Sequence, residues 1–165
     1  MATLHFICGK AGAGKTTLAR ELGRRAPAVV ICEDEWISTL GFAVRALEQY
    51  LDASARCRAL IASLVPELLR QGANVVLDFA GNTVKGRAWV RSLFEAAKAD
   101  HQLHWLDASD EVCLARIHQR NAERPEGLYW GQVSDELFHQ VTARFVPPGA
   151  DERFEVVRSV VKSAI

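Results

Sequence analysis

The sequence has no excess of charge of either sign. Twenty Lys and Arg side chains balance twenty Asp and Glu side chains, so the formal net charge at pH 7 is zero. Proteins that bind nucleic acid or a membrane surface through their overall field carry a net excess of one charge. The balance therefore disfavours both kinds of partner, although a local basic groove for nucleic acid stays compatible with it.

Cysteine is sparse, and its spacing excludes two kinds of stabilising site. The four cysteines, Cys8, Cys32, Cys57 and Cys113, form no C-x-x-C pair and have no histidine at ligand spacing. Disulfide frameworks and structural zinc sites both need such clustering. We expect four reduced, buried thiols and a cytoplasmic protein.

Long apolar runs are missing too. The most apolar internal stretch, residues 59–65, meets Pro66 and Glu67 well short of the length that crosses a membrane. No basic and then apolar leader precedes the first apolar run, so we expect a soluble protein without a membrane partner. The 165 residues are 49% hydrophobic, which predicts one compact domain over residues 1–165 and no separate substrate domain.

One segment carries a specific motif. Residues 9–16 read GKAGAGKT, a complete G-x-x-x-x-G-K-[ST] phosphate-binding loop. Its glycines let backbone N–H groups turn towards phosphate oxygens without an intervening side chain. The alternative is a glycine-rich turn that matches by chance. The flanks disfavour it, because residues 3–8 are a strand-like apolar run and residues 15–25 have a helical pattern.

This loop predicts a nucleotide site. Lys15 can reach the β- and γ-phosphates, and the Thr16 hydroxyl can ligate Mg²⁺. The expected nucleotide-binding residues of the loop are Gly9, Lys10, Ala11, Gly12, Ala13, Gly14, Lys15, Thr16 and Thr17. We expect ATP and Mg²⁺ as the cofactors.

Further apolar runs, typical of strands, cover residues 28–32, 74–78, 101–106 and 154–161. Helical patterns separate them. Near-continuous apolar strands that alternate with helices indicate a parallel sheet covered on both faces. The predicted fold is therefore a doubly wound α/β domain, a three-layer α/β/α sandwich with a five-stranded parallel sheet.

The helical segments between these strands differ in length. They are residues 36–71, where Pro66 is expected to kink or divide the helix, residues 85–98, residues 110–121, and a last helix capped by Ser134. Residues 124–132 are expected to form a loop.

Ligands of such sheets bind beyond the carboxyl ends of the strands, so carboxylates placed there are candidates for catalysis. Asp34 follows the second strand, and we expect it to activate an acceptor hydroxyl or to ligate the metal. Asp78 ends the third strand and is expected to hold Mg²⁺. Two alternatives stay open: Glu33, Asp34 and Glu35 could only form an acidic first helical turn, and Asp78 could only cap a turn.

Two arginines follow the fourth strand. Arg116 and Arg120 lie one helical turn apart, and we expect them on a lid over residues 116–132. Their guanidinium groups would bind phosphate oxygens, and closure of the lid would exclude water. The alternative is a solvated basic helix end. Trp36 is expected either to line the acceptor pocket or to pack in the core.

Together these motifs resemble the small P-loop kinases that include chloramphenicol phosphotransferase, zeta toxins and polynucleotide 5′-hydroxyl kinases. The likeness is strongest to compact bacterial AAA-type ATP-binding proteins. It runs through residues 9–17, Asp34, residues 75–87, residues 116–121 and residues 133–157. It implies the strand order 2-3-1-4-5 with a helical lid.

The resemblance also implies roles for individual residues. By likeness the loop binds ATP, Asp34 activates the acceptor, and Arg116 and Arg120 hold phosphates. Asp78, Asn82 and Arg87 form a D-x-x-x-N…R pattern, which implies that Asn82 and Arg87 lie near the metal or the acceptor substrate.

The leading hypothesis is an ATP- and Mg²⁺-dependent kinase that phosphorylates a hydroxyl of a small-molecule acceptor. Two alternatives stay open. A polynucleotide 5′-hydroxyl kinase would need a cationic groove along the nucleic-acid backbone, and a regulatory ATPase would act through its nucleotide-bound state. The chain has no N-K-x-D guanine motif and no ABC-type signature, which disfavours GTPases and transporters. No feature of the sequence specifies an oligomeric state.

Overall fold

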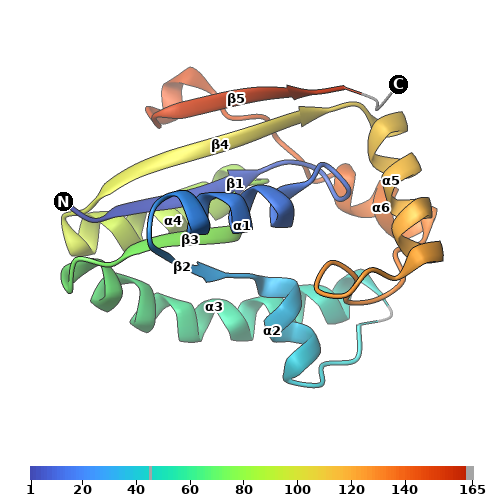
Figure 1. Cartoon of the computed structure of the whole chain (residues 1–165), viewed down its shortest axis with the longest axis horizontal. Coiled ribbons are helices and arrows are strands. Elements are labelled where there is room, and N and C mark those ends of the chain that lie inside the picture. Colours follow the sequence, from blue (N-terminus) through green and yellow to red (C-terminus); the bar gives the residue numbers. More distant parts are fainter. Residues whose placement is uncertain (45, 163–165) are drawn as a thin grey trace.

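The computed structural model describes residues 1–44 and 46–162. Within them, five parallel strands form one sheet in the order β2-β3-β1-β4-β5 (Figure 1). The strands are β1 (Thr3–Cys8), β2 (Ala28–Ile31), β3 (Asn74–Ala80), β4 (Asp100–Ala108) and β5 (Val156–Val161). The predicted α/β fold and its strand order are confirmed.

Helices cover both faces of this sheet. They are α1 (Lys15–Arg25), α2 (Glu33–Thr39), α3 (Leu47–Arg70), α4 (Val84–Ala97), α5 (Asp110–Glu123), α6 (Asp135–Thr142) and a short 3₁₀ helix, η1 (Ala150–Glu152). Helix α1 lies on one face, and α3 and α4 lie on the other (Figure 1). Helices α5 and α6 stand beyond the carboxyl ends of β1 and β4, where they extend the structure past the sheet.

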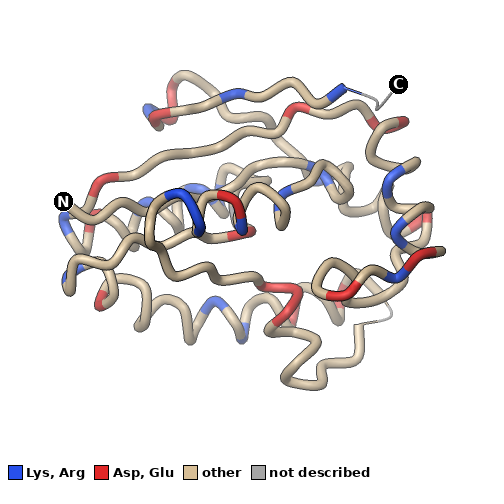
Figure 2. Tube along the Cα trace, in the orientation of Figure 1, with Lys and Arg blue, Asp and Glu red and all other residues tan. Residues whose placement is uncertain are grey.

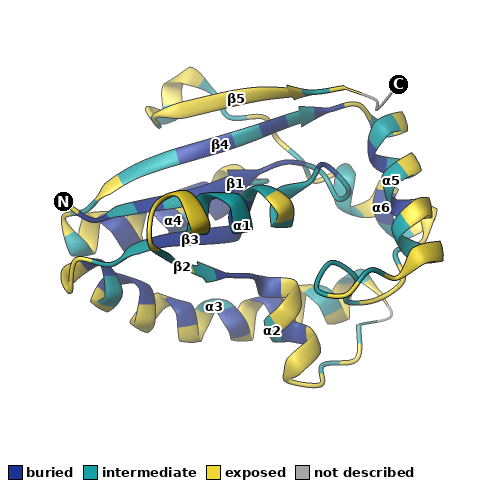
Figure 3. Cartoon of the chain, viewed as in Figure 1, coloured by how far each residue is buried: buried dark blue, intermediate teal, exposed yellow. Residues whose placement is uncertain are grey.

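Two clusters of buried apolar residues lie on the two faces of the sheet. Figure 3 shows buried positions along the inner strands and on the helices that cover them. Successive side chains of a strand point to opposite faces, so β1 contributes to both clusters. Leu4 and Phe6 pack with the cluster of α3 and α4, whereas Ile7 packs with that of α1, α5 and α6. This double burial is why the inner strands read as continuous apolar runs.

The predicted helical region at residues 36–71 is two helices, and its predicted break is wrong. Pro66 lies buried inside α3, which continues to Arg70. The division falls earlier, because Gly41 adopts a left-handed backbone with φ 73° and ends α2. Its N–H bonds to the carbonyl of Ser38, and the N–H of Phe42 bonds to that of Ile37. This pattern is a glycine helix stop.

Two other expectations, the cap at Ser134 and the buried thiols, are met. The Ser134 hydroxyl accepts a hydrogen bond from the N–H of Leu137 at 3.1 Å and caps α6. All four cysteines carry free, buried thiols. In the part of the chain that the structure describes, no helix combines the length and apolarity needed to cross a membrane.

Candidate active site

A cavity of about 1460 Å³ opens at the carboxyl end of the sheet. Its walls come from the phosphate-binding loop, α2, α3, the start of α4, α5 and the loop that follows α5. These segments are far apart in the sequence, but parallel strands bring their carboxyl ends to one edge. The cavity is therefore the place where the predicted functional side chains can meet.

The glycines of the phosphate-binding loop are required by its geometry. Gly12 and Gly14 have φ angles of 80° and 102°, in the left-handed region that other residues rarely adopt. A Cβ atom on Gly12 would also lie 2.5 Å from the carbonyl oxygen of Cys113 in α5. The loop consequently packs closely against α5 and cannot accept side chains at these two positions.

Lysine side chains hold this loop in shape. The Nζ atom of Lys15 donates to the carbonyl oxygens of Gly9 at 2.8 Å and Lys10 at 2.9 Å. The Nζ atom of Lys10 lies 2.5 Å from Oδ1 of Asp110 at the start of α5. Lys15 is thus positioned over the loop, where its ammonium group faces the expected phosphate site.

Thr16 and Asp78 form a pair of oxygen donors. The Thr16 hydroxyl donates to Oδ2 of Asp78 at 2.5 Å, while Oδ1 of Asp78 is buried and has no hydrogen-bond partner among the described residues. Burial raises the pKa of Asp78, and it also raises the pKa of the neighbouring Cys32 thiol to about 12. The Thr16 hydroxyl and the Asp78 carboxylate, whose Oδ1 atom is unused, fit Mg²⁺, which prefers hard oxygen ligands.

Asp34 lies in the first turn of α2 and lines the cavity. Its side chain is open to the cavity, but the protein walls around it replace much of the bulk water. This desolvation raises the pKa of Asp34, and the charges of Lys15 and Arg120 oppose the rise. The predicted base, the loop lysine and a lid arginine therefore lie within electrostatic range of one another.

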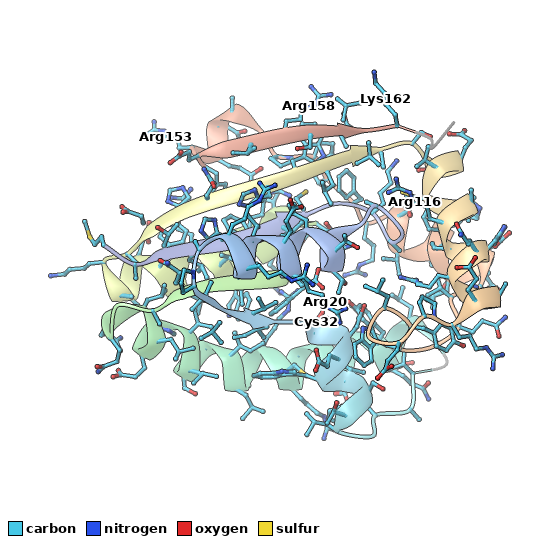
Figure 4. All side chains as sticks on the ribbon, viewed as in Figure 1. Arg20, Cys32, Arg116, Arg153, Arg158 and Lys162 are labelled. Atoms are coloured by element: carbon cyan, nitrogen blue, oxygen red, sulfur yellow. The ribbon has the colours of Figure 1, made fainter. Side chains whose placement is uncertain are left out.

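The two predicted lid arginines both reach the cavity from α5. Figure 2 shows the basic residues of α5 and the acidic start of α2 at the same end of the sheet. Arg116, labelled in Figure 4, donates from Nη1 to the carbonyl of Ala13 at 3.3 Å. The Nε atom of Arg120 is buried without a hydrogen-bond partner among residues 1–44 and 46–162. Arg120 thus retains a donor for a phosphate oxygen.

The loop after α5 is held by contacts that we did not predict. Arg20 of α1, also labelled in Figure 4, donates from Nη2 to the carbonyl of Gly127. The side chain of Asn121 bonds to Val133 twice, donating to its carbonyl at 2.8 Å and accepting from its N–H at 3.3 Å. Asn121 therefore ties the two ends of the loop together. Two sequence signals could have suggested an ordered loop: Asn121 near the end of α5 and Gly127 in the loop that follows.

A second carboxylate group, Glu33, was treated in the sequence only as a possible helix-turn residue. It is buried, with 2% of its surface exposed. Its Oε1 atom accepts from the Ser54 hydroxyl at 2.6 Å, and its Oε2 atom accepts from the Tyr50 hydroxyl at 3.0 Å. Burial raises the pKa of Glu33. No local pattern signalled this site, because its partners come from α3.

Arg87 does not reach the cavity, so its predicted contact with the acceptor is not supported. The side chain is fully buried, and Nε and Nη2 each bond to a carboxylate oxygen of Glu152 at 2.7 Å. Nη1 donates to the carbonyls of Gly81 at 2.7 Å and Val146 at 2.8 Å, and Nη2 also approaches Pro147 O at 3.4 Å. These contacts use all five N–H donors of the guanidinium.

The other predicted acceptor contacts differ in position. Asn82 lines the cavity, but its Oδ1 atom accepts a hydrogen bond from the N–H of Gly9 at 2.8 Å. It therefore anchors the start of the phosphate-binding loop. Trp36 is half-buried and packs against the core, and it is absent from the cavity wall in the described residues. Its alternative role in packing is the one that the structure supports.

Comparisons with known proteins agree with this fold. A family model described as an AAA domain matches residues 4–148. No curated protein matches the sequence. Among solved structures, a candidate kinase from Chloroflexus aurantiacus is 19% identical, with 96% of this chain and 85% of that chain covered and a TM-score of 0.72.

Two further structures are similar. The APS kinase of Mycobacterium tuberculosis in complex with AMPPNP and APS is 15% identical, with 99% and 90% of the two chains covered and a TM-score of 0.68. Kti12 of Chaetomium thermophilum in complex with ADP-AlF₃ is 17% identical, with 96% and 88% covered and a TM-score of 0.68. At these identities the likeness shows a shared P-loop kinase fold.

Proposed function

The chain belongs to the AAA domain family, and from this membership we propose that it is an ATP- and Mg²⁺-dependent kinase with a small-molecule hydroxyl acceptor. The observation that carries the proposal is the convergence of Asp34, Lys15 and Arg120 on one cavity beside the Thr16–Asp78 pair. Phosphoryl transfer needs these groups together: a carboxylate for the acceptor, cations for the phosphates and oxygen ligands for a metal.

Each group has a part in the transfer. The backbone of residues 9–17 and the side chains of Lys15, Arg116 and Arg120 bind the phosphates of ATP. Asp34 takes the proton of the acceptor hydroxyl, and the oxygen of that hydroxyl bonds to the γ-phosphorus. The bond from that phosphorus to the bridging β–γ oxygen breaks, and ADP leaves. Lys15 and Arg120 stabilise the charge that moves between the phosphate oxygens.

Thr16 and Asp78 would hold the metal, and Asp34 is a further candidate ligand. When bound, Mg²⁺ neutralises phosphate charge and orients the β- and γ-phosphates. Residues 1–44 and 46–162 contain no cluster of three or more His, Cys, Asp or Glu side chains suited to a metal. We infer that ATP phosphates and water supply the other ligands, as is usual for Mg²⁺.

We assign the loop and helix end over residues 116–132 to a lid. Arg20 of α1 holds this segment from outside and Asn121 ties its two ends together, so that it can shield the reacting groups from water. Exclusion of water would favour transfer to the acceptor over hydrolysis of ATP. The free thiols are consistent with our placement of the protein in the cytoplasm.

The test is ADP release with Mg·ATP against a panel of hydroxyl acceptors. The panel holds sugars, sugar acids, aminoglycosides, phenicols, nucleosides and 5′-hydroxyl oligonucleotides, and Lys15→Ala is the blank. Stimulation by one small-molecule class supports the proposal. Stimulation by oligonucleotides alone would make the protein a polynucleotide kinase, and tight ATP binding with no stimulation by any acceptor would favour a regulatory ATPase.

A further inference from the structure

Arg58 presents a guanidinium group to the cavity from the middle of α3. Its side chain is 31% exposed, and its Nε atom is buried without a hydrogen-bond partner among the described residues. A buried N–H group without a hydrogen-bond partner costs free energy. An arginine with unpaired N–H groups beside a cavity therefore has donors that a ligand can use.

Aromatic side chains hold this guanidinium in place. Its central carbon lies 5.1 Å from the ring centroid of Trp89 and 5.8 Å from that of Phe79. Trp89 comes from α4 and Phe79 from β3. Contacts of this kind attract a cation to the ring face, so two other elements fix the position of the Arg58 side chain on α3.

The nearby carboxylate of Glu33 forms an ion pair with only one edge of Arg58. The Nε atom of Arg58 lies 3.6 Å from Oε1 of Glu33, beyond an ordinary hydrogen bond. Both oxygens of Glu33 already accept hydrogen bonds from Ser54 and Tyr50. The Nε edge of Arg58 therefore balances the charge of Glu33, while its two Nη groups form no hydrogen bond within the described residues and stay available to a ligand.

A second cationic side chain and the size of the cavity also support a binding site for a second ligand. Lys85 lines the cavity from the first turn of α4, and its side chain is exposed there. Ligand pockets usually measure about 300–1,000 Å³, and a cavity of about 1460 Å³ has room for a nucleotide and a second ligand. The nucleotide end carries Lys15, Arg116 and Arg120, so Arg58 and Lys85 are additional to the phosphate-binding set.

We propose that Arg58, assisted by Lys85, binds an anionic group of the acceptor, which makes the substrate a small molecule with both a hydroxyl and a carboxylate or phosphate. This inference rests on the proposed kinase function, because the acceptor hydroxyl is the group that Asp34 activates. A planar guanidinium recognises either anion through paired hydrogen bonds. The neutral side of the wall, which includes Ala55 and Ala59 of α3, fits the carbon skeleton.

The test measures binding and does not depend on turnover. The Arg58 Nε–H resonance is observed by NMR in the full chain and identified by its loss in Arg58→Lys. Matched probes are titrated in the presence of Mg·ADP: D-gluconate against D-glucitol for a carboxylate, and D-ribose 5-phosphate against D-ribose for a phosphate. Calorimetry with the same probes measures binding to the variants Arg58→Gln and Lys85→Gln, and Arg70→Gln, at an exposed arginine at the end of α3 that pairs with Glu67, is the control.

We expect an anionic probe to shift the Arg58 resonance at millimolar concentration and its neutral counterpart to leave it unchanged. Arg58→Gln should weaken binding of that probe about tenfold or more, Lys85→Gln less, and Arg70→Gln not at all. Equal binding of neutral and anionic probes, binding that Arg58→Gln does not weaken, or no shift with any anion would overturn the proposal.

The probe that responds also identifies the source of the charge, since one pair carries a carboxylate and the other a phosphate. The same probes enter the ADP-release assay. Anion binding at Arg58 without any phosphoryl transfer would contradict the kinase function and leave the anion site standing. Transfer to neutral acceptors alone would support the kinase and contradict the anion site.

Discussion

The hydroxyl of Thr16 and the carboxylate of Asp78 meet at 2.5 Å across 62 positions of sequence. Thr16 lies in the first turn of α1, which follows β1, and Asp78 lies in β3. Strands β1 and β3 are parallel neighbours, so the chain segments at their carboxyl ends come together. Strand order therefore assembles the pair of oxygen donors that suits a magnesium ion.

Replacement of Lys15 by alanine should remove turnover. The substitution deletes the ammonium group that faces the phosphates and two hydrogen bonds that shape the loop. We expect the rate of ADP release to fall at least about 100-fold, the scale of losing one charge-stabilising donor. Lys162→Ala, at an exposed lysine just after β5, is the matched control. Equal loss in both variants would contradict a specific role for Lys15.

Asp34→Asn should abolish transfer and leave ATP affinity near that of the wild type. The amide keeps the size of the side chain but cannot accept the hydroxyl proton, and general bases contribute about 10²–10⁴ to a rate. Calorimetry measures ATP binding and a coupled assay measures transfer. Glu35→Gln, at an exposed carboxylate in the same helical turn, is the control. Unchanged transfer in Asp34→Asn would remove Asp34 from the base role.

The pH dependence of kcat/KM offers an independent check of Asp34. A general base must be deprotonated, so the rate should rise as pH increases through its pKa. The protein walls raise the pKa of Asp34 above the ordinary value of 3.8, more than Lys15 and Arg120 lower it. The acid limb of the profile should therefore lie above pH 3.8. An acid limb below that value would contradict the assignment.

Arg120→Ala should slow the chemical step more than it weakens nucleotide binding. Its guanidinium retains a buried donor and lies close enough to Asp34 to lower that pKa. We expect kcat to fall about 100-fold with a smaller change in ATP affinity, because the lost interaction strengthens in the transition state. Arg24→Ala, at an exposed arginine near the end of α1, is the control. A kcat equal to that of the wild type would contradict the lid arginine.

The residues that the sequence could place are those tied to local patterns. Gly12 and Lys15 belong to a motif of fixed spacing, and Asp78 lies near the carboxyl end of an apolar strand, where parallel sheets bind ligands. A glycine after a helical turn is also a signal for the helix stop at Gly41, but the prediction placed the break only at Pro66. Burial of Pro66 inside α3 shows that tertiary packing decided otherwise.

The residues that the sequence could not place depend on contacts between distant segments. Glu33 is satisfied by Tyr50 and Ser54 of another helix, and Arg58 is fixed by rings from α4 and β3. Arg87 was placed near the metal or the acceptor because Asp78, Asn82 and Arg87 resemble the D-x-x-x-N…R segment of small P-loop kinases. Its partner Glu152 is 65 positions away, so no local pattern could reveal the buried pair.

Arg87 and Glu152 provide the prediction with the clearest test of stability. Arg87→Met should destabilise the fold by about 3–5 kcal/mol, because it leaves Glu152 and three backbone carbonyls without their buried donor. Chemical denaturation monitored by circular dichroism measures the free energy of unfolding. Arg56→Met, at an exposed arginine of α3 paired with Asp52, should change it by less than about 1 kcal/mol.

The same pair predicts the dependence of stability on pH. Hydrogen bonds from Arg87 lower the pKa of Glu152 in the folded state below the ordinary value of 4.5. A carboxylate with a lowered folded pKa stabilises the protein above its unfolded pKa, and this contribution is lost as pH falls through the folded value. Glu152→Gln should therefore be less stable than the wild type at pH 7, and the difference should shrink below about pH 4.5. The comparison cancels the opposite contributions of Asp34 and Asp78, whose pKa values are raised. A difference that stays constant from pH 7 to pH 3 would mean that Glu152 stabilises the fold through its shape and not its charge.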